Sequence, residues 1–124
     1  MLQLLAIAGG GALGALSRFW ISTGVYRVLG RDFPWGTLAV NVIGSFLMGL
    51  LFVLLTERLA VAPEWRGAVL VGFLGALTTF STFSIETLNL IEQGALLRAT
   101  LNVGASVGVC VLLCWAGIAL GRSL

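Results

Sequence analysis

The chain has 124 residues, of which 59% are apolar and 10% are charged, with seven basic residues, five acidic residues and no histidine. This composition, with a mean hydropathy of +1.08, is typical of an integral membrane protein and leaves no room for a separate soluble domain. Because the chain has no histidine and no nucleophile grouped with a base, we expect no enzyme activity, and we expect no nucleic-acid partner.

Four apolar stretches are each long enough to cross a bilayer, which requires about 20 predominantly apolar residues in a helix. They run from Leu4 to Tyr26, Trp35 to Thr56, Gly67 to Ile85 and Ala99 to Gly121. The connections are short and carry charges, glycine or proline, as tight turns do. We therefore predict a single all-α transmembrane domain over residues 1–124, built from four helices.

Arginines are divided evenly between the two ends of these helices. One end carries Arg58, Arg66 and Arg122, and the other carries Arg27, Arg31 and Arg98. Excess basic residues in short loops normally fix the cytoplasmic side, so an even division favours insertion in both orientations. Two such copies would form a dual-topology antiparallel homodimer, whose two-fold axis brings elements at equal depth together. The alternative is that one helix or the lipid fixes a single orientation.

The first span contains two closely spaced glycines and a charge. Gly10 and Gly14 are four residues apart, the spacing that lets membrane helices approach closely. Arg18 lies several turns inside the span, where a cation is costly unless it reaches water, a partner or an anion. It either extends to the membrane surface or lies at an aqueous vestibule that concentrates anions. The amino terminus lacks a basic region, so we expect no cleavable signal peptide.

The second span carries no charge, and its amide side chain therefore stands out. Asn41 and Ser45 are four residues apart and share one face of the helix. An asparagine in a membrane often forms a hydrogen bond between helices. Its amide can equally donate to an anion, and the sequence leaves both interpretations open.

The third span contains a polar stripe that a helix would place on one side. Its members are Gly75, Thr79, Thr82, Glu86, Asn89 and Gln93. Phe80 and Phe83 border this stripe, since each is one position beyond a threonine. An anion beside the stripe would meet the positive edges of their rings. The alternative is that they are ordinary core aromatic residues.

The same segment is a poor helix former. Between Gly75 and Thr79, glycine occurs close to β-branched threonines whose hydroxyls compete for backbone hydrogen bonds. We therefore predict that helix three is broken at mid-membrane within this range. A break frees carbonyl oxygens, which bind cations in several transporters, and a dimer axis at this depth would bring two sets together.

The fourth span repeats the polar pattern more weakly. Asn102, Ser106 and Cys110 are spaced four residues apart and form one row. This row either lines a route through the protein or holds helices together. Cys110 and Cys114 are predicted to be small apolar packing residues, and not a disulfide or metal-binding pair.

Three motifs, one in each of the first three spans, match a known family. They are GGxxGAxxR from Gly10 to Arg18, GTLxVNxxGSFxxG from Gly36 to Gly49, and GFLGxLTTFSTFS from Gly72 to Ser84. In this order, and over essentially the whole chain, they resemble the Fluc (CrcB) family of fluoride channels. The resemblance implies passive fluoride export across the inner (plasma) membrane by an antiparallel homodimer with two pores. It also implies a central, structural Na⁺.

The family motif and the polar stripe together mark the residues that we assign to the fluoride pore. These are Asn41, Thr79, Phe80, Ser81, Thr82 and Phe83. Arg18 matches the arginine that ends the first motif and is our vestibule candidate. The resemblance implies that Na⁺ is held by the main-chain carbonyls of Gly75 and Thr78 of each subunit. Ala76 stands where many members have a second glycine, and Phe19 replaces a common tyrosine.

Two other functions fit parts of the sequence. A small multidrug-type exchanger is also a four-helix, dual-topology protein, but its coupling chemistry requires a carboxylate in the membrane. Glu86 is the only candidate for that carboxylate. A non-transporting helical scaffold would need no more than the close-packing glycines. Passive fluoride conduction explains the hydroxyls, amides and rings together, because a bare anion in hydrocarbon needs donors along its whole path.

Overall fold

The computed structural model describes residues 1–124 and consists of helices and their connections. Four helical stretches are long and apolar enough to cross a membrane, which confirms the predicted all-α arrangement of four spans. They are Leu2–Leu29, Trp35–Arg58, Pro63–Glu92 and Leu96–Ser123. Each extends past the predicted apolar stretch at one or both ends, because helical hydrogen bonding continues into more polar sequence.

The first and last spans are single helices, whereas the middle two change geometry along their length. The first is α1, Leu2–Leu29, and the last is α6, Leu96–Ser123. The second consists of α2, Trp35–Val53, and a π-helical turn, Leu54–Arg58. The third consists of α3, Pro63–Arg66, a π-helical stretch, Gly67–Phe73, then α4, Leu74–Leu77, and α5, Phe80–Glu92.

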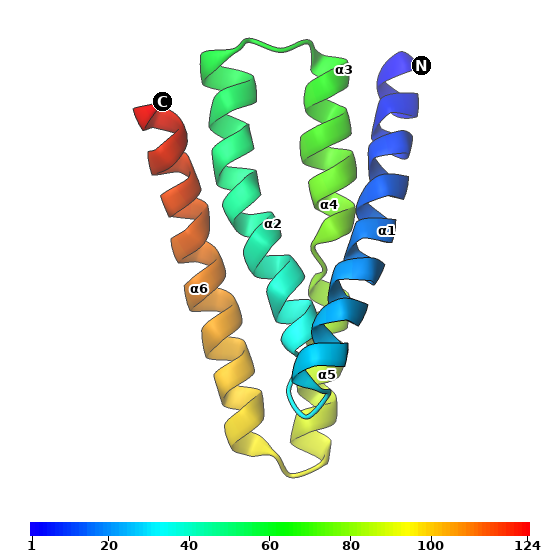
Figure 1. Ribbon diagram of the computed structural model, residues 1–124, viewed down its shortest axis with the longest axis vertical. Coiled ribbons are helices and arrows are strands. Elements are labelled where there is room, and N and C mark those ends of the chain that lie inside the picture. The colour runs from blue at the N-terminus through cyan, green and yellow to red at the C-terminus, as the bar shows by residue number, and fades with distance from the viewer.

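The four spans form a splayed bundle of alternating direction (Figure 1). α6 lies along α2, while α1 lies along the segment that leads from α3 to α4. Both chain termini lie at the same end as the connection between α2 and α3, and the turn between α5 and α6 lies at the opposite end (Figure 1). Two of the turns use a glycine with positive φ, 82° at Gly30 and 78° at Gly94, a conformation that glycine adopts without steric cost.

Glycines occupy the closest helix crossings. A Cβ atom on Gly10 would lie 2.0 Å from the carbonyl oxygen of Ala68, and Gly14 is equally confined by the third span. The predicted close-packing role of this pair is therefore confirmed. Gly49 makes the matching crossing between α2 and α6, where a Cβ atom would lie 2.0 Å from the carbonyl oxygen of Cys114. Backbones pack directly at these points because no side chain stands between them.

The fully buried core is small, and it lies beside α4. Only 19 of the 124 residues are buried, and most large apolar side chains face outwards, as in a protein surrounded by lipid or by a second subunit. Val40, Leu74 and Leu77 form the one buried apolar cluster and hold α4 against α2. This packing fixes the position of the residues that follow Leu77.

Candidate functional site

The third span is interrupted between α4 and α5. Helical geometry ends at Leu77 and begins again at Phe80. The two residues between them are extended, with φ −86° and ψ 157° at Thr78 and φ −151° and ψ 123° at Thr79. The interruption therefore lies at the carboxyl-terminal end of the predicted range, residues 75–79. Gly75 itself stays helical within α4.

Threonine hydroxyls bind backbone groups on both sides of the interruption. The Thr78 hydroxyl donates to the carbonyl oxygen of Leu74 over 3.0 Å, where α4 ends. The Thr79 side chain caps α5, because its Oγ1 accepts the N–H of Thr82 over 3.2 Å. This is the competition between hydroxyls and backbone that the sequence indicated.

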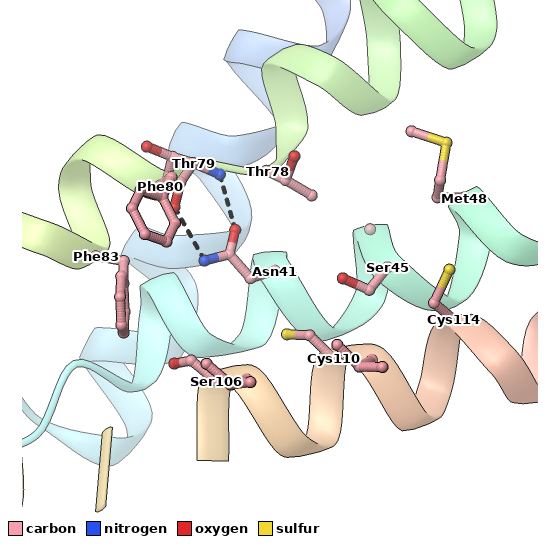
Figure 2. A pocket seen from close by; sticks show the side chains of 13 residues that line it. Asn41, Ser45, Met48, Thr78, Thr79, Phe80, Phe83, Ser106, Cys110 and Cys114 are labelled. Carbon is pink, nitrogen blue, oxygen red and sulfur yellow. Dashed lines mark hydrogen bonds between the residues drawn. The ribbon is translucent and has the colours of Figure 1, made fainter. Parts of the chain in front are cut away.

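Asn41 on α2 binds both backbone groups of Thr79 (Figure 2). Its Oδ1 accepts the Thr79 N–H over 2.8 Å, and its Nδ2 donates to the Thr79 carbonyl oxygen over 3.0 Å. The amide thus forms a hydrogen bond between helices, which was one of the two interpretations of Asn41. A carboxamide carries two N–H groups, so one of them is still free to serve a ligand.

The carbonyl oxygens of residues 75–78 lose their α-helical donors at the interruption, and those of Gly75 and Thr78 are two of them. In a continuous helix, the carbonyl of Gly75 would accept from the N–H of Thr79, and that of Thr78 would accept from the N–H of Thr82. The first of these N–H groups is bound by Asn41 and the second by the Thr79 hydroxyl. Gly75 and Thr78 are the two residues whose carbonyls we predicted as cation ligands.

A groove of about 380 Å³ opens beside the interruption, between α2, the extended threonines, α5 and α6. Amide, hydroxyl and backbone groups form one part of its lining, and sulfur, aromatic and aliphatic side chains form the rest (Figure 2). The polar side chains are those of Asn41, Ser45, Thr78, Thr79 and Ser106. The groove brings together polar side chains from three of the four spans.

The two phenylalanines of the predicted pore both line this groove. Their ring centroids are 5.3 Å apart and their planes are tilted by 44°. Phe83 is buried, with 9% of its surface exposed, whereas Phe80 is 77% exposed. The pair therefore forms one boundary of the groove, and Phe80 extends beyond the protomer's own packing.

Two of the predicted pore residues and the predicted vestibule residue lie outside the groove lining. Ser81 and Thr82 are linked to Thr79 instead, since its Oγ1 lies 3.4 Å from Ser81 Oγ and 3.1 Å from Thr82 Oγ1. Arg18 is half-buried on α1, and its Nε is enclosed without a hydrogen-bond partner. The structure brings Asn41, Thr79 and the two phenylalanines together, and it leaves these three at the periphery.

The predicted polar stripe is divided between two places. Glu86, Asn89 and Gln93 line a separate, polar pocket of about 260 Å³ with Tyr26, Arg31 and Arg98, among others. The Tyr26 hydroxyl donates to Glu86 Oε2 over 2.8 Å, while Glu86 Oε1 is buried without a partner. The prediction that Gly75 belongs to this stripe is wrong. Two extended residues separate α4 from α5, so positions before and after them do not share one helical phase.

The row on α6 also divides. Ser106 and Cys110 line the groove, but Asn102 is 1% exposed and donates to the Thr87 hydroxyl over 2.9 Å. Both interpretations of the row therefore apply, to different residues. Cys110 and Cys114, predicted to be apolar packing residues, are free thiols that line the groove and are only partly buried.

Several residues that line the groove were not among the predicted site residues. Met48 on α2 is one of them. Its spacing of seven residues from Asn41, two helical turns along the same face, was the available signal.

Four apolar spans and a groove at an interrupted helix define a multi-pass helical membrane protein. Irregular backbone at membrane depth occurs where it is buried in protein or lines a cavity, and interrupted helices form ion and substrate sites in transporters. The sequence matches the family described as "CrcB-like protein, Camphor Resistance (CrcB)" over residues 5–118. The chain belongs to this family, which confirms the resemblance seen in its motifs.

Relatives similar over the whole chain carry the name "Fluoride-specific ion channel FluC". The protein from Methylococcus capsulatus is 63% identical over 123 residues, 99% of this chain and 54% of the relative. This chain thus spans about half the length of that relative. The proteins from Magnetococcus marinus and Citrifermentans bemidjiense are 54% and 52% identical, and the matches cover 98% and 100% of both chains, respectively.

Proposed function

We propose that this protein is a fluoride channel that lets fluoride leave the cytoplasm passively. The observation that carries this proposal is the groove at the interruption of the third span, where Asn41, Thr79, Phe80 and Phe83 meet. Family membership and the names of the relatives support fluoride as the ion. We place the protein in the inner (plasma) membrane, where export lowers cytoplasmic fluoride.

The groove supplies what a small anion requires in a membrane. Transfer of an ion from water to a medium of low dielectric constant costs tens of kcal/mol by Born solvation, so donors must replace water along the path. The second N–H of Asn41 and the hydroxyl of Ser45 are donors in this groove. The Thr79 hydroxyl continues the path to Ser81 and Thr82.

Aromatic edges add to these donors without adding a formal charge. The edge of a phenylalanine ring carries partial positive charge, and both rings border the groove. A ring edge attracts an anion more weakly than an arginine does, so an ion bound there can leave again, as conduction requires. Arg18 is the proposed vestibule cation, because its enclosed Nε has no partner within the chain.

Two copies in opposite orientations would complete the pore. Phe80 is 77% exposed in the protomer. Exposing this apolar ring to water would be unfavourable, whereas contact with another subunit would remove it from water. The even arginine division supports a dual-topology homodimer in the lipid bilayer. Two-fold symmetry gives such a dimer two equivalent grooves and therefore two pores.

The proposed central Na⁺ fits the residues present. The carbonyls of Gly75 and Thr78 have lost their helical donors to Asn41 and to the Thr79 hydroxyl. Uncharged oxygens at an interrupted helix are typical Na⁺ ligands in transporters. One chain offers two such carbonyls, so an antiparallel partner would supply the second pair. Bound there, the ion would join the two subunits and add positive field near the fluoride path.

The exchanger alternative gains no support from the position of Glu86. This carboxylate lines the polar pocket at the helix ends and accepts a hydrogen bond from Tyr26, and it does not line the groove. The deciding experiment is efflux from liposomes followed with a fluoride electrode. Reconstituted protein should release fluoride and retain chloride without a proton gradient. Strict dependence of flux on protons would identify an exchanger, and absence of flux would leave a scaffold.

A further inference from the structure

Asn41 and Thr79 connect the groove to the carbonyls proposed for Na⁺. Asn41 binds the Thr79 N–H over 2.8 Å and the Thr79 carbonyl over 3.0 Å, from a different span. Thr79 is the more extended of the two non-helical residues. The only side-chain hydrogen bonds between α2 and the interruption are therefore made to the residue where the helix is most distorted.

The chemistry of this contact requires an amide. Buried backbone N–H and C=O groups must be paired, and an extended residue inside a helical span has lost both helical partners. A carboxamide offers one acceptor and two donors, so it can satisfy both groups of the same residue. A hydroxyl is too short to span both, and an ionised carboxylate has no donor.

The hydrogen bond from the Thr79 N–H to Asn41 determines whether the Gly75 carbonyl has a helical donor. If Thr79 were helical, its N–H would be the donor to the Gly75 carbonyl. Asn41 removes that donor, and the Gly75 oxygen becomes available to another partner. The Thr79 hydroxyl acts in the same way on the Thr78 carbonyl by capping Thr82.

We propose that Asn41 is a positioning residue that holds the third span interrupted and presents the Gly75 carbonyl to a monovalent cation. This inference rests on the proposed function, which includes the cation. Asn41 would then act on both ions: its free N–H faces the groove, and its two bonds to Thr79 shape a cation site that it does not touch. Because Asn41 lines the groove and also binds the Thr79 backbone, a change at Asn41 should alter Na⁺ binding as well as fluoride flux.

The test compares Asn41→Ala with Ser45→Ala in the detergent-solubilised, full-length protein. Ser45 lines the same groove on the same face of α2 but has no hydrogen bond to the interruption. Melting temperature is measured in NaCl and in choline chloride. We expect Na⁺ to raise the melting temperature of the native protein and of Ser45→Ala, and we expect this shift to disappear in Asn41→Ala. A full Na⁺ shift in Asn41→Ala, or none in the native protein, would overturn the proposal.

Amide hydrogen exchange provides a second readout that needs no variant. In the native protein the Thr79 N–H should exchange at least about tenfold more slowly, the equivalent of about 1.4 kcal/mol, than the amides of Phe80 and Ser81, the first two of α5, which have no helical acceptor. Fast exchange at Thr79 would overturn the proposal even if Asn41→Ala failed to fold. Asn41→Asp keeps the acceptor, so slow exchange at Thr79 should survive in it.

Fluoride efflux from liposomes, measured on the same preparations, distinguishes failure of the positioning role from failure of the proposed function. If the native protein conducts fluoride but Asn41→Ala keeps its Na⁺ shift, only the positioning role is wrong. If the native protein conducts no fluoride, the proposed function is wrong, whatever the exchange data show.

Discussion

Phe80 and Phe83 lie with ring centroids 5.3 Å apart, yet 77% of Phe80 is exposed and only 9% of Phe83. One ring is therefore held by the protomer, and the other is free to contact a second subunit. This asymmetry predicts different outcomes at the two positions.

Replacing Phe80 with isoleucine should reduce fluoride flux at least about tenfold, the equivalent of about 1.4 kcal/mol, because the aliphatic side chain has no positive edge. Stability of the protomer should hardly change, since Phe80 packs little within it. Phe83→Ile is the matched comparison and should reduce both flux and stability. The measurements are electrode-recorded efflux and size-exclusion chromatography of the dimer. Normal conduction by Phe80→Ile would exclude this ring from the pore lining.

The hydrogen bond between Asn102 and Thr87 should contribute to stability, because it joins α6 to α5 in a buried position. A double-mutant cycle of Asn102→Ala and Thr87→Val is expected to give a coupling of about 0.6 kcal/mol, and at most about 1.7 kcal/mol, the range measured between membrane helices. Unfolding in mixed micelles provides the free energies. Zero coupling would mean that this contact does not hold the two helices together.

Gly10→Ala should destabilise the protein by about 1–3 kcal/mol, the usual cost of forcing extra volume into a packed site. The new Cβ atom would lie 2.0 Å from the carbonyl oxygen of Ala68. At the neighbouring Gly9, a Cβ atom would have nothing within 4 Å, so Gly9→Ala is the control and should be neutral or slightly stabilising. Equal melting temperatures for the two variants would contradict the close approach of α1 to the third span.

Thiol-specific reagents should block conduction, since both cysteines of the chain line the groove. A charged methanethiosulfonate added to proteoliposomes is expected to abolish most of the flux. The Cys110→Ser, Cys114→Ser double variant should conduct and resist the reagent. If the native protein is labelled at Cys110, as mass spectrometry would reveal, and still conducts fully, the groove is not the ion path.

Orientation in the membrane should respond to single arginines, because three lie at each end of the predicted helices. A reporter fused to the carboxyl terminus should be found on both sides of the membrane. Arg98→Ala and Arg66→Ala remove a charge from opposite ends, so they should shift the population in opposite directions. One fixed orientation in all three proteins would remove the basis for an antiparallel dimer.

The four spans, their tight turns and the residue types of the groove could all be predicted from local sequence. Apolar length is a local property, and an amide or hydroxyl in a membrane requires a partner whatever the fold. The low helix propensity of the segment that begins at Gly75 could be predicted too, because it also depends on local residue composition. The motifs also identified the family, because they record side-chain requirements that its members share.

The use that the protein makes of these residues depends on tertiary contacts. The interruption lies at Thr78 and Thr79, and not at Gly75, because Asn41 on another span binds the Thr79 backbone. The polar stripe divides into a groove and a separate pocket because the extended residues reset the helical phase. Similarly, the row on α6 divides because Asn102 is buried against Thr87, whereas Ser106, which donates to Asn102, lines the groove. Each outcome depends on a contact between residues distant in the sequence, and no local pattern encodes such a contact.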